Sequence, residues 1–319
     1  MTPPPAPPTD RPATGFADAT PLLACPEKLR ARAEEDGFLF FKQFLPPDPL
    51  LDLRRQIIDI VARRGWIRPG TDPMDGAADL AAVADADRRD PSLRYIGVTD
   101  EVYREIQRLE LFHSLPHDPR IVGLYEALFD GPVFVHPRHI ARVLLPSPSF
   151  TPTPPHQDYI YIQGTHRFWT LWFPLGDCPV ELGGLSVMRG SHHEPILDVT
   201  SARGAGGKQV ILCGKDCDWV QDHYQCGDVI TFPSHLVHRG LPNQLGDRIR
   251  ISLDLRYQPA DEPIEEQSLR PHMDVITWEE IYSGWKSDRL KYYWNSRPMR
   301  LAAWDASLLA DNPRKEKIC

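Results

Sequence analysis

The sequence predicts a mainly β core with helices before and after it, and two features of its pattern favour this fold class. Between about residues 132 and 258, short runs of β-branched and aromatic residues alternate with turns built from Gly, Pro, Asn and Asp, which is typical of a sandwich, jelly roll or barrel. On both sides of this region, apolar residues recur at helical spacing instead. We therefore expect a single domain over residues 21–319, with helical support at 21–131, the β core at 132–258 and a helical extension at 259–319.

Composition narrows the class of protein. The chain has 319 residues, of which 41% are hydrophobic and 25% charged, so it is long enough to bury a large core. Its formal net charge of −8 argues against a nucleic-acid partner, which usually requires an excess of Lys and Arg. No run approaches the roughly 18 apolar residues of a membrane span. Proline-rich residues 1–20 are typical of a disordered tail rather than a signal peptide, so we expect a cytoplasmic protein.

The segment before the β core combines helix formers with one short apolar and aromatic run. Glycine stops a helix readily, and Gly, Asp and Ala together favour a loop. In chain order we expect a helix at 26–36 that stops at Gly37, a buried strand at 38–41, a helix from Asp48 to about Arg64, a loop with one short helix at 68–92 and a helix pair at 100–129.

The β core and the extension follow the same logic. The predicted strands cover residues 133–135, 140–145, 168–175, 185–187, 209–212, 228–232 and 248–257. After Pro259, Trp278, Tyr282 and Trp285 recur at helical spacing, which predicts one amphipathic helix packed on the core.

Six cysteines lie far apart except for one group. In a chain of this size without a signal sequence we expect reduced thiols. Cys213, Cys217, His223 and Cys226 could in principle close a zinc site, but their spacing is looser than the paired cysteines of zinc ribbons. Zinc is therefore the less favoured interpretation of this group.

Two stretches of the β region carry candidate metal ligands. In His156-Gln157-Asp158, a strand would place the imidazole and the carboxylate on the same face. The run 227–232 predicts a strand whose following turn delivers His238 to the mouth of the barrel. Two histidines and one carboxylate are the facial triad of non-haem Fe(II) oxygenases, although the same donors also hold catalytic zinc.

Residues 248–257 alternate strictly between polar and apolar side chains, which predicts a strand with one polar face. In a barrel that face lines the interior, where buried arginines need an anionic partner such as the far carboxylate of a dicarboxylate cosubstrate. The other interpretation is an edge strand whose charges face solvent. Periodicity alone does not separate the two.

Taken in order, these pieces resemble the phytanoyl-CoA dioxygenase family of Fe(II)- and 2-oxoglutarate-dependent oxygenases, over roughly residues 28–258. The matching pieces are residues 35–39, 156–158, 172–175, 183–185, 190–192, 227–238, Asn243 and 250–257. The resemblance implies a double-stranded β-helix, that is, a cupin-like jelly roll. It also implies Fe(II), 2-oxoglutarate and O2 as cofactor and cosubstrates.

Carried over residue by residue, the resemblance makes His156, Asp158 and His238 the iron ligands and places Trp172 near the cosubstrate. The family's 2-oxoglutarate arginine is Arg250 or Arg248. Arg250 is preferred because it keeps the family's distance to Tyr257 within a strand of fixed register. Gly240 stands where several relatives have a serine that helps to hold the cosubstrate, so another donor must serve here.

The implied reaction is hydroxylation of an unactivated C–H bond of a small-molecule substrate, with release of succinate and CO2. Desaturation and ring closure remain open, whereas Asp158 argues against halogenation, because halogenating relatives lack this carboxylate. Two other classes are a non-catalytic jelly-roll binding module and a zinc hydrolase that uses the same three residues. The glycine-rich segment 193–222 is either a substrate lid or a surface insertion.

Overall fold

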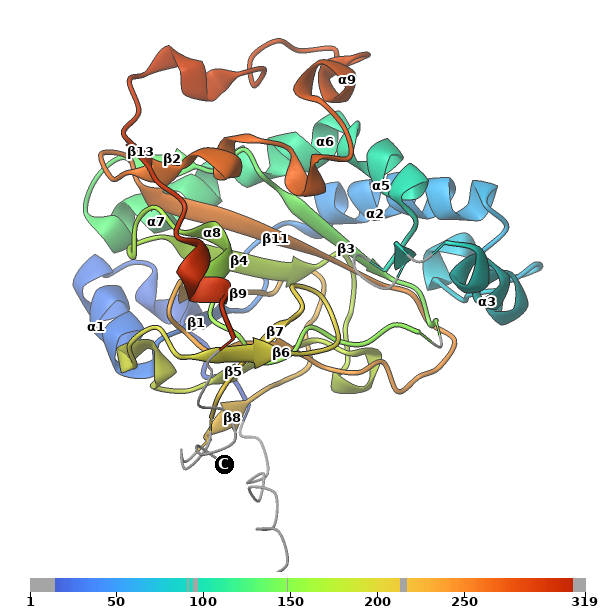
Figure 1. Cartoon of the computed structure of the whole chain (residues 1–319), viewed down its shortest axis with the longest axis horizontal. Helices are drawn as coiled ribbons and strands as arrows, with labels where there is room; N and C mark the ends of the chain where they lie inside the picture. The colour runs from blue at the N-terminus through green and yellow to red at the C-terminus, as the bar shows by residue number, and fades with distance from the viewer. Residues whose placement is uncertain (1–14, 91, 94–96, 148, 213–216, 312–319) are drawn as a thin grey trace, which may run out of the picture.

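The computed structural model describes residues 15–311, apart from 91, 94–96, 148 and 213–216. Its centre is a pair of antiparallel sheets that pack face to face (Figure 1). Trp172, Ile230 and Phe232 of one sheet share a buried cluster with Val187 and Val220 of the other. The predicted mainly β jelly-roll core is therefore confirmed.

The larger sheet has six strands. Its order is β1 (Leu39–Phe41), β9 (Val229–Pro233), β4 (Trp169–Pro174), β11 (Arg250–Pro259) and β2 (Val133–Val135), with β3 (Ile140–Leu144) also paired to β11. The smaller sheet has the order β10 (His238–Gly240), β5 (Leu185–Met188) and β8 (Trp219–Val220). Separate two-stranded pairs are formed by β6 (Val199–Ser201) with β7 (Lys208–Val210), and by β12 (Ile264–Glu265) with β13 (Leu301–Ala302).

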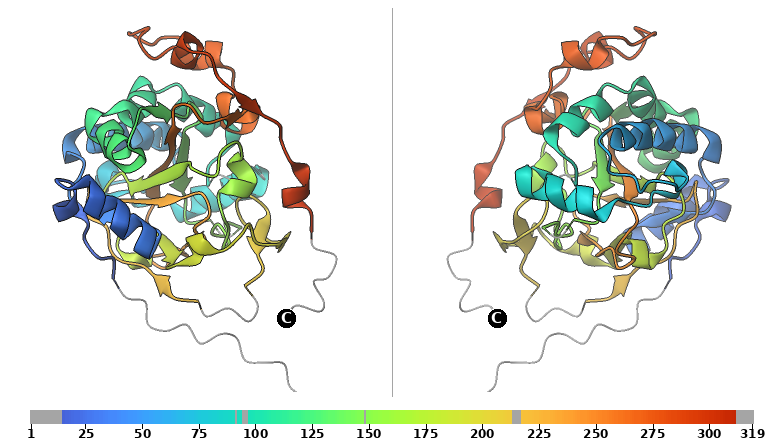
Figure 2. Two further views of the ribbon diagram at one scale, coloured as in Figure 1. Left: turned by 90° about the vertical axis from the view of Figure 1, so that its left-hand side faces the viewer. Right: turned by 90° about the vertical axis from the view of Figure 1, so that its right-hand side faces the viewer.

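Strand β11 separates two environments, because its side chains alternate between the faces of the large sheet. Ile251, Leu253, Leu255 and Tyr257 join the main hydrophobic core, which also holds the apolar faces of the N-terminal helices (Figure 2). Arg250, Ser252, Asp254 and Arg256 face the other way, toward the smaller sheet. The polar face predicted for residues 248–257 therefore lines the interior from residue 250 onward.

The N-terminal helices follow the predicted pattern closely. They are α1 (Pro26–Asp36), α2 (Pro47–Arg63), α3 (Leu80–Arg89), α5 (Asp100–Gln107), α6 (Glu110–Ser114) and α7 (Pro119–Phe129). Gly37 ends α1 in the left-handed conformation with φ of 77°, as its position predicted. The expected helix pair at 100–129 is three helices, because Leu109 and residues 115–118 interrupt the helical run.

The packed chain begins before residue 21. Of the expected tail at 1–20, residues 1–14 lie outside the described part of the chain. Phe16 is buried and stacks on Phe40 at 5.0 Å between ring centroids, and Asp18 forms a bridge with Phe40. Residues 15–20 thus add to the core rather than to a tail.

The C-terminal extension contains less regular helix than expected. Its α-helix, α9 (Trp278–Tyr282), starts at a Thr277–Glu280 capping box and is followed by Gly284 with φ of 89°. Ser283 has an extended backbone and Gly284 a left-handed one, so the helix ends at Tyr282 and the prediction that Trp285 lies on it was wrong. Trp285 still packs on Tyr282, with ring centroids 4.7 Å apart. Within the described residues, no helix is both long and apolar enough to cross a membrane.

Buried histidines beneath this extension make stability depend on pH. Burial lowers the pKa of His113 and of His117 to about 4, and burial among other cationic groups holds the pKa of His139 well below its usual value. The unfolded chain takes up these protons near pH 6.5, so stability is complete above that pH and falls as the pH drops toward 4. For His113 alone, we expect the free energy of unfolding to fall by about 1.4 kcal/mol for each pH unit below 6.5. The measurement is the urea midpoint at pH values between 7.5 and 5. A His113→Gln variant should show a shallower dependence, and an unchanged slope would contradict this origin.

Candidate active site

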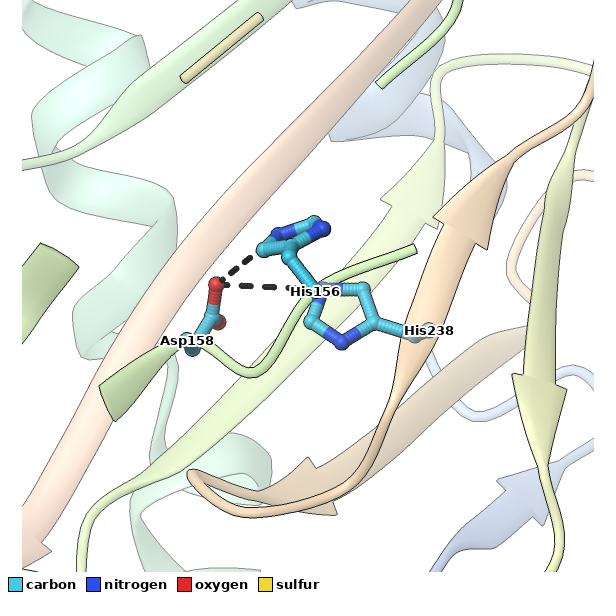
Figure 3. A group of neighbouring side chains, drawn as sticks. All are labelled: His156, Asp158 and His238. Carbon is cyan, nitrogen blue, oxygen red and sulfur yellow. Dashed lines mark ion pairs between the residues drawn. The ribbon is translucent and has the colours of Figure 1, made fainter. Parts of the chain in front are cut away.

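Three buried side chains from two segments of the chain meet beside the β core (Figure 3). His156 Nε2 lies 3.4 Å and His238 Nε2 lies 3.7 Å from Asp158 Oδ1, and all three donor atoms fall within 4.8 Å of one another. Among the described residues, this is the one group of three or more His, Cys, Asp or Glu side chains close enough to share a metal ion. The sequence prediction brought together the same three residues.

Backbone pairing positions the two histidines. His156 and His238 each donate an N–H to the other's carbonyl oxygen at 3.0 Å, which extends β10 by a short antiparallel bridge. Asp158 does not share a strand with His156, as one way of placing both on the same face supposed: its backbone is helical and directly precedes α8 (Tyr159–Ile162). The turn into α8, rather than strand alternation, brings the carboxylate to the side of the histidines.

Hydrogen bonds to backbone carbonyls fix the tautomer of both imidazoles. His156 Nδ1 lies 2.8 Å from the Pro154 oxygen, and His238 Nδ1 lies 3.0 Å from the Leu236 oxygen. A carbonyl oxygen only accepts, so each Nδ1 carries a proton, and the Nε2 that faces Asp158 is the atom free to bind a metal. Burial and the neighbouring His156 lower the pKa of His238 to about 4, so it is neutral at physiological pH.

The two oxygens of Asp158 have different surroundings. Oδ2 accepts hydrogen bonds from the Thr170 hydroxyl and from Arg256 Nη2, the latter at 3.1 Å, while Oδ1 faces the histidines. Burial alone would raise the pKa of this carboxyl, but the Arg256 guanidinium holds it well below its usual value. The Nε2 atoms of two imidazoles and one ionised carboxylate oxygen therefore converge, which is a donor set suited to a divalent transition metal.

Sequence analysis did not single out Arg256, although the signal was present. Arg256 lies on the polar side of the alternating run with Arg250 and Asp254. It is buried and forms the ion pair with Asp158. Its pairing partner could not be deduced without the sheet, because 98 residues separate the two positions.

A cavity of about 510 Å³ opens beside the three side chains. Arg250, Asp254 and Arg256 of β11 and Trp172 of β4 line it, together with apolar side chains such as Ile140, Leu144, Phe150, Leu185 and Leu241. The buried Arg250 guanidinium bonds to the Ser252 hydroxyl and lies 5.6 Å from the centre of the Trp172 ring. Within the described residues it has no carboxylate at ion-pair distance, and its buried Nε has no hydrogen-bond partner.

Arg248, the alternative to Arg250, lies outside this cavity. Its Nη1 donates to the Asp75 carbonyl oxygen at 3.0 Å, and its Nε lies 3.5 Å from Asp247. The side chain is 41% exposed. An uncompensated buried guanidinium next to the triad, as at Arg250, fits a dicarboxylate such as 2-oxoglutarate, whereas Arg248 does not.

Comparison with known proteins places these features in a family. The model of the phytanoyl-CoA dioxygenase family (PhyH) matches residues 33–252, which hold the triad, Trp172 and Arg250. The chain belongs to the phytanoyl-CoA dioxygenase family. It is accordingly an iron- and 2-oxoglutarate-dependent dioxygenase that consumes O2, and the donor set and the unpaired Arg250 fit both groups.

Individual relatives agree with this assignment. Over 265 residues, the chain is 28% identical to a 1-deoxypentalenic acid 11-beta-hydroxylase of Streptomyces arenae, covering 77% of this chain and 85% of the relative. The enzyme of the same description from Streptomyces exfoliatus is 26% identical. The solved structure of the epimerase SnoN, in complex with Fe3+, alpha ketoglutarate and nogalamycin RO, has the same fold. It is 21% identical with a TM-score of 0.51, covering 76% of this chain and 86% of that one.

The structure does not support a zinc site at Cys213, Cys217, His223 and Cys226 of this dioxygenase. Cys213 lies outside the described residues. His223 Nδ1 accepts a hydrogen bond from the Val180 N–H at 3.1 Å, so the ring is engaged in the fold. Cys217, His223 and Cys226 do not form a metal-binding group in the part of the chain that the structure describes.

The β6–β7 hairpin, residues 199–210, covers one side of the cavity. Ala205, Gly206 and Gly207 at its tip line the cavity wall. A Cβ on Gly206 would lie 2.6 Å from the Tyr161 hydroxyl, so the tip packs tightly there. Of the two interpretations of segment 193–222, this position favours a lid.

We expect Gly206→Ala to lift the hairpin from Tyr161 and to increase 2-oxoglutarate consumption that yields no product, because water then reaches the site. The measurement is the ratio of succinate to oxidised substrate. Gly207→Ala is the matched control, since Gly207 also has a positive φ but nothing within 4 Å of an added Cβ. Equal ratios in wild type and both variants would show that the hairpin is not a lid.

Gln157, between two triad residues, holds three segments together. It is fully buried, and its Nε2 donates to the His235 and Pro195 oxygens at 2.8 and 3.1 Å. Its Oε1 accepts from the Leu197 N–H at 2.8 Å. Gln157 thus links the His156 segment to the turn before His238 and to the base of the hairpin.

Replacing Gln157 with leucine removes hydrogen bonds to three part-buried backbone groups, which contribute about 0.5–1.5 kcal/mol each. We expect a lower unfolding temperature and weaker metal retention against a chelator. Gln209→Leu on β7 is the control, and equal chelator resistance in both variants would contradict a role for Gln157 in holding the triad.

Proposed function

We propose that this dioxygenase hydroxylates an unactivated C–H bond of a small, largely apolar molecule. In this proposal His156, Asp158 and His238 hold Fe(II), and Arg250 anchors 2-oxoglutarate. The observation that carries it is the convergence of two histidine Nε2 atoms, one ionised carboxylate oxygen and an uncompensated buried arginine on one cavity.

The bound iron supplies the oxidation, which O2 and the conversion of 2-oxoglutarate to succinate and CO2 make possible. The protein's own residues bind, orient and exclude water. The Pro154 and Leu236 carbonyls orient the imidazoles, and Thr170 and Arg256 hold Asp158 ionised with one oxygen turned to the site. Arg250 offers a charge-assisted bond to the far carboxylate of the cosubstrate, beside the Trp172 ring.

Hydroxylation is favoured over other outcomes on two grounds. The relatives from Streptomyces are named as hydroxylases, and Asp158 occupies the position that a halogenating enzyme leaves to chloride. The cavity volume and its apolar lining suit a small molecule with a carbon skeleton. A zinc hydrolase would leave the buried charge of Arg250 without a partner, so it is the weaker candidate.

The test is succinate release by protein loaded with Fe(II) without oxygen and then given 2-oxoglutarate and air. Substrates are screened as polycyclic acids, 1-deoxypentalenic acid among them, and products are weighed by mass spectrometry. We expect a mass gain of one oxygen that derives from labelled O2. His193→Ala, at an exposed histidine, is the control for His156→Ala. Turnover by zinc-loaded protein without 2-oxoglutarate would overturn the proposal.

A further inference from the structure

The arginines that line the cavity are not all neutralised by its acids. Four arginines and two aspartates line it. Arg256 pairs with Asp158 at 3.1 Å, and Arg142 pairs with Asp254 at 3.2 Å. Within the described residues, Arg250 and Arg138 have no carboxylate at ion-pair distance. Since the cosubstrate accounts for Arg250, Arg138 is left without an assigned partner.

Arg138 is held in place at the cavity wall. It lies between β2 and β3, and its Nε donates to the Arg270 carbonyl oxygen at 3.2 Å. Neither Nη atom has a hydrogen-bond partner among the described residues. Asp274 and Glu265 are the acids whose charges act on it, but neither is within 4.0 Å. The hydrogen bond from Nε thus orients the guanidinium, and both Nη nitrogens remain free to donate hydrogen bonds.

The net charge of the cavity lining also favours an anionic ligand near Arg138. His156 and His238 would give their Nε2 lone pairs to the metal and so add no charge, and burial and the nearby arginines hold the pKa of His272 well below its usual value. The lining therefore carries two net positive charges. A divalent metal and a doubly charged 2-oxoglutarate cancel each other, so this excess remains when both are bound. Such an excess favours a substrate that itself carries negative charge.

We propose that Arg138 binds the carboxylate of the substrate, which is an organic acid with an apolar body. Two free Nη donors match the two oxygens of a carboxylate in a bidentate pair. The apolar body then packs against Ile140, Leu144 and Phe150 on the cavity wall. This inference rests on the proposed function and adds the chemical class of the substrate and the residue that selects it.

Binding without turnover tests the inference. Wild-type protein with Mn(II) and 2-oxoglutarate is titrated under nitrogen with adamantane-1-carboxylic acid and decanoic acid, each against its methyl ester and the corresponding alkyl phosphate, by tryptophan fluorescence and thermal shift. We expect at least one acid to bind tenfold or more tightly than its ester. Arg138→Gln should abolish that preference while the affinity for 2-oxoglutarate stays unchanged, and Arg138→Lys should retain part of it.

Arg270→Gln is the matched control, because Arg270 is a neighbouring exposed cation that does not line the cavity. Several outcomes would overturn the inference: no acid preferred over its ester, a phosphate preferred over the acid, an equal loss in Arg270→Gln, or an Arg138→Gln variant that loses 2-oxoglutarate affinity instead. Failure of the proposed function looks different. There 2-oxoglutarate would neither bind nor yield succinate, while the discrimination between acid and ester by Arg138 would persist.

Discussion

Asp158→Asn protein is expected to release no succinate above background, although it should still fold. The substitution removes the negative charge that binds the metal but keeps a side chain of the same shape beside Arg256 and Thr170. His156→Ala and His238→Ala should show the same loss, since each removes one of three metal donors. The measurements are iron content after gel filtration and succinate formation.

Asp158→Ala is a less suitable variant because it leaves Arg256 buried without a partner. Breaking a buried ion pair by removing one member costs about 3–5 kcal/mol, so this variant should also unfold at lower urea concentration. Asp288→Asn, at an exposed aspartate, is the control for Asp158→Asn. Wild-type turnover in Asp158→Asn would show that the triad does not hold the iron.

Arg250→Ala should raise the KM for 2-oxoglutarate about a hundredfold or more. The variant leaves the far carboxylate of the cosubstrate buried and unpaired, a loss of about 3–5 kcal/mol. At saturating 2-oxoglutarate, kcat should recover in part, because the iron ligands are unchanged. Arg248→Ala serves as the comparison, since Arg248 faces Asp75 and Asp247 outside the cavity and should change KM little. If Arg248→Ala raised the KM for 2-oxoglutarate more than Arg250→Ala did, Arg248 would be the residue that binds the cosubstrate.

Local pattern was sufficient to predict most of the β core. The choice of Arg250 over Arg248 combined the family's spacing to Tyr257 with the fixed register of a strand, and strand β11 does begin at Arg250. Gly37 marked the end of α1, because glycine adopts a left-handed backbone at little cost. In each case the determining interactions lie within a few residues of the chain.

The features that were missed depend on contacts between distant segments. The shared side of His156 and Asp158 was explained by a possible strand, but Asp158 turns into the helix Tyr159–Ile162 instead. The Arg256–Asp158 pair requires β11 and the α8 segment to meet. Trp285 was placed on a helix by its spacing, and Gly284 outweighed that spacing. Periodicity shows which face of its own helix or strand a residue lies on. It does not show which other segment of the chain that face contacts.

The alternation along β11 also determines which sequence changes this enzyme can accept. A substitution on this strand affects one side chain. Inserting or deleting one residue within the strand moves every later side chain to the opposite face of the sheet. A one-residue insertion within β11, just after Arg250, would carry Arg256 into the apolar core and leucines into the active site. Length variation is therefore tolerable only where the chain can absorb it before the strand begins, in the turn at residues 241–249. Divergence of this enzyme toward new substrates is thus confined to point replacements on β11 and to length changes in its loops.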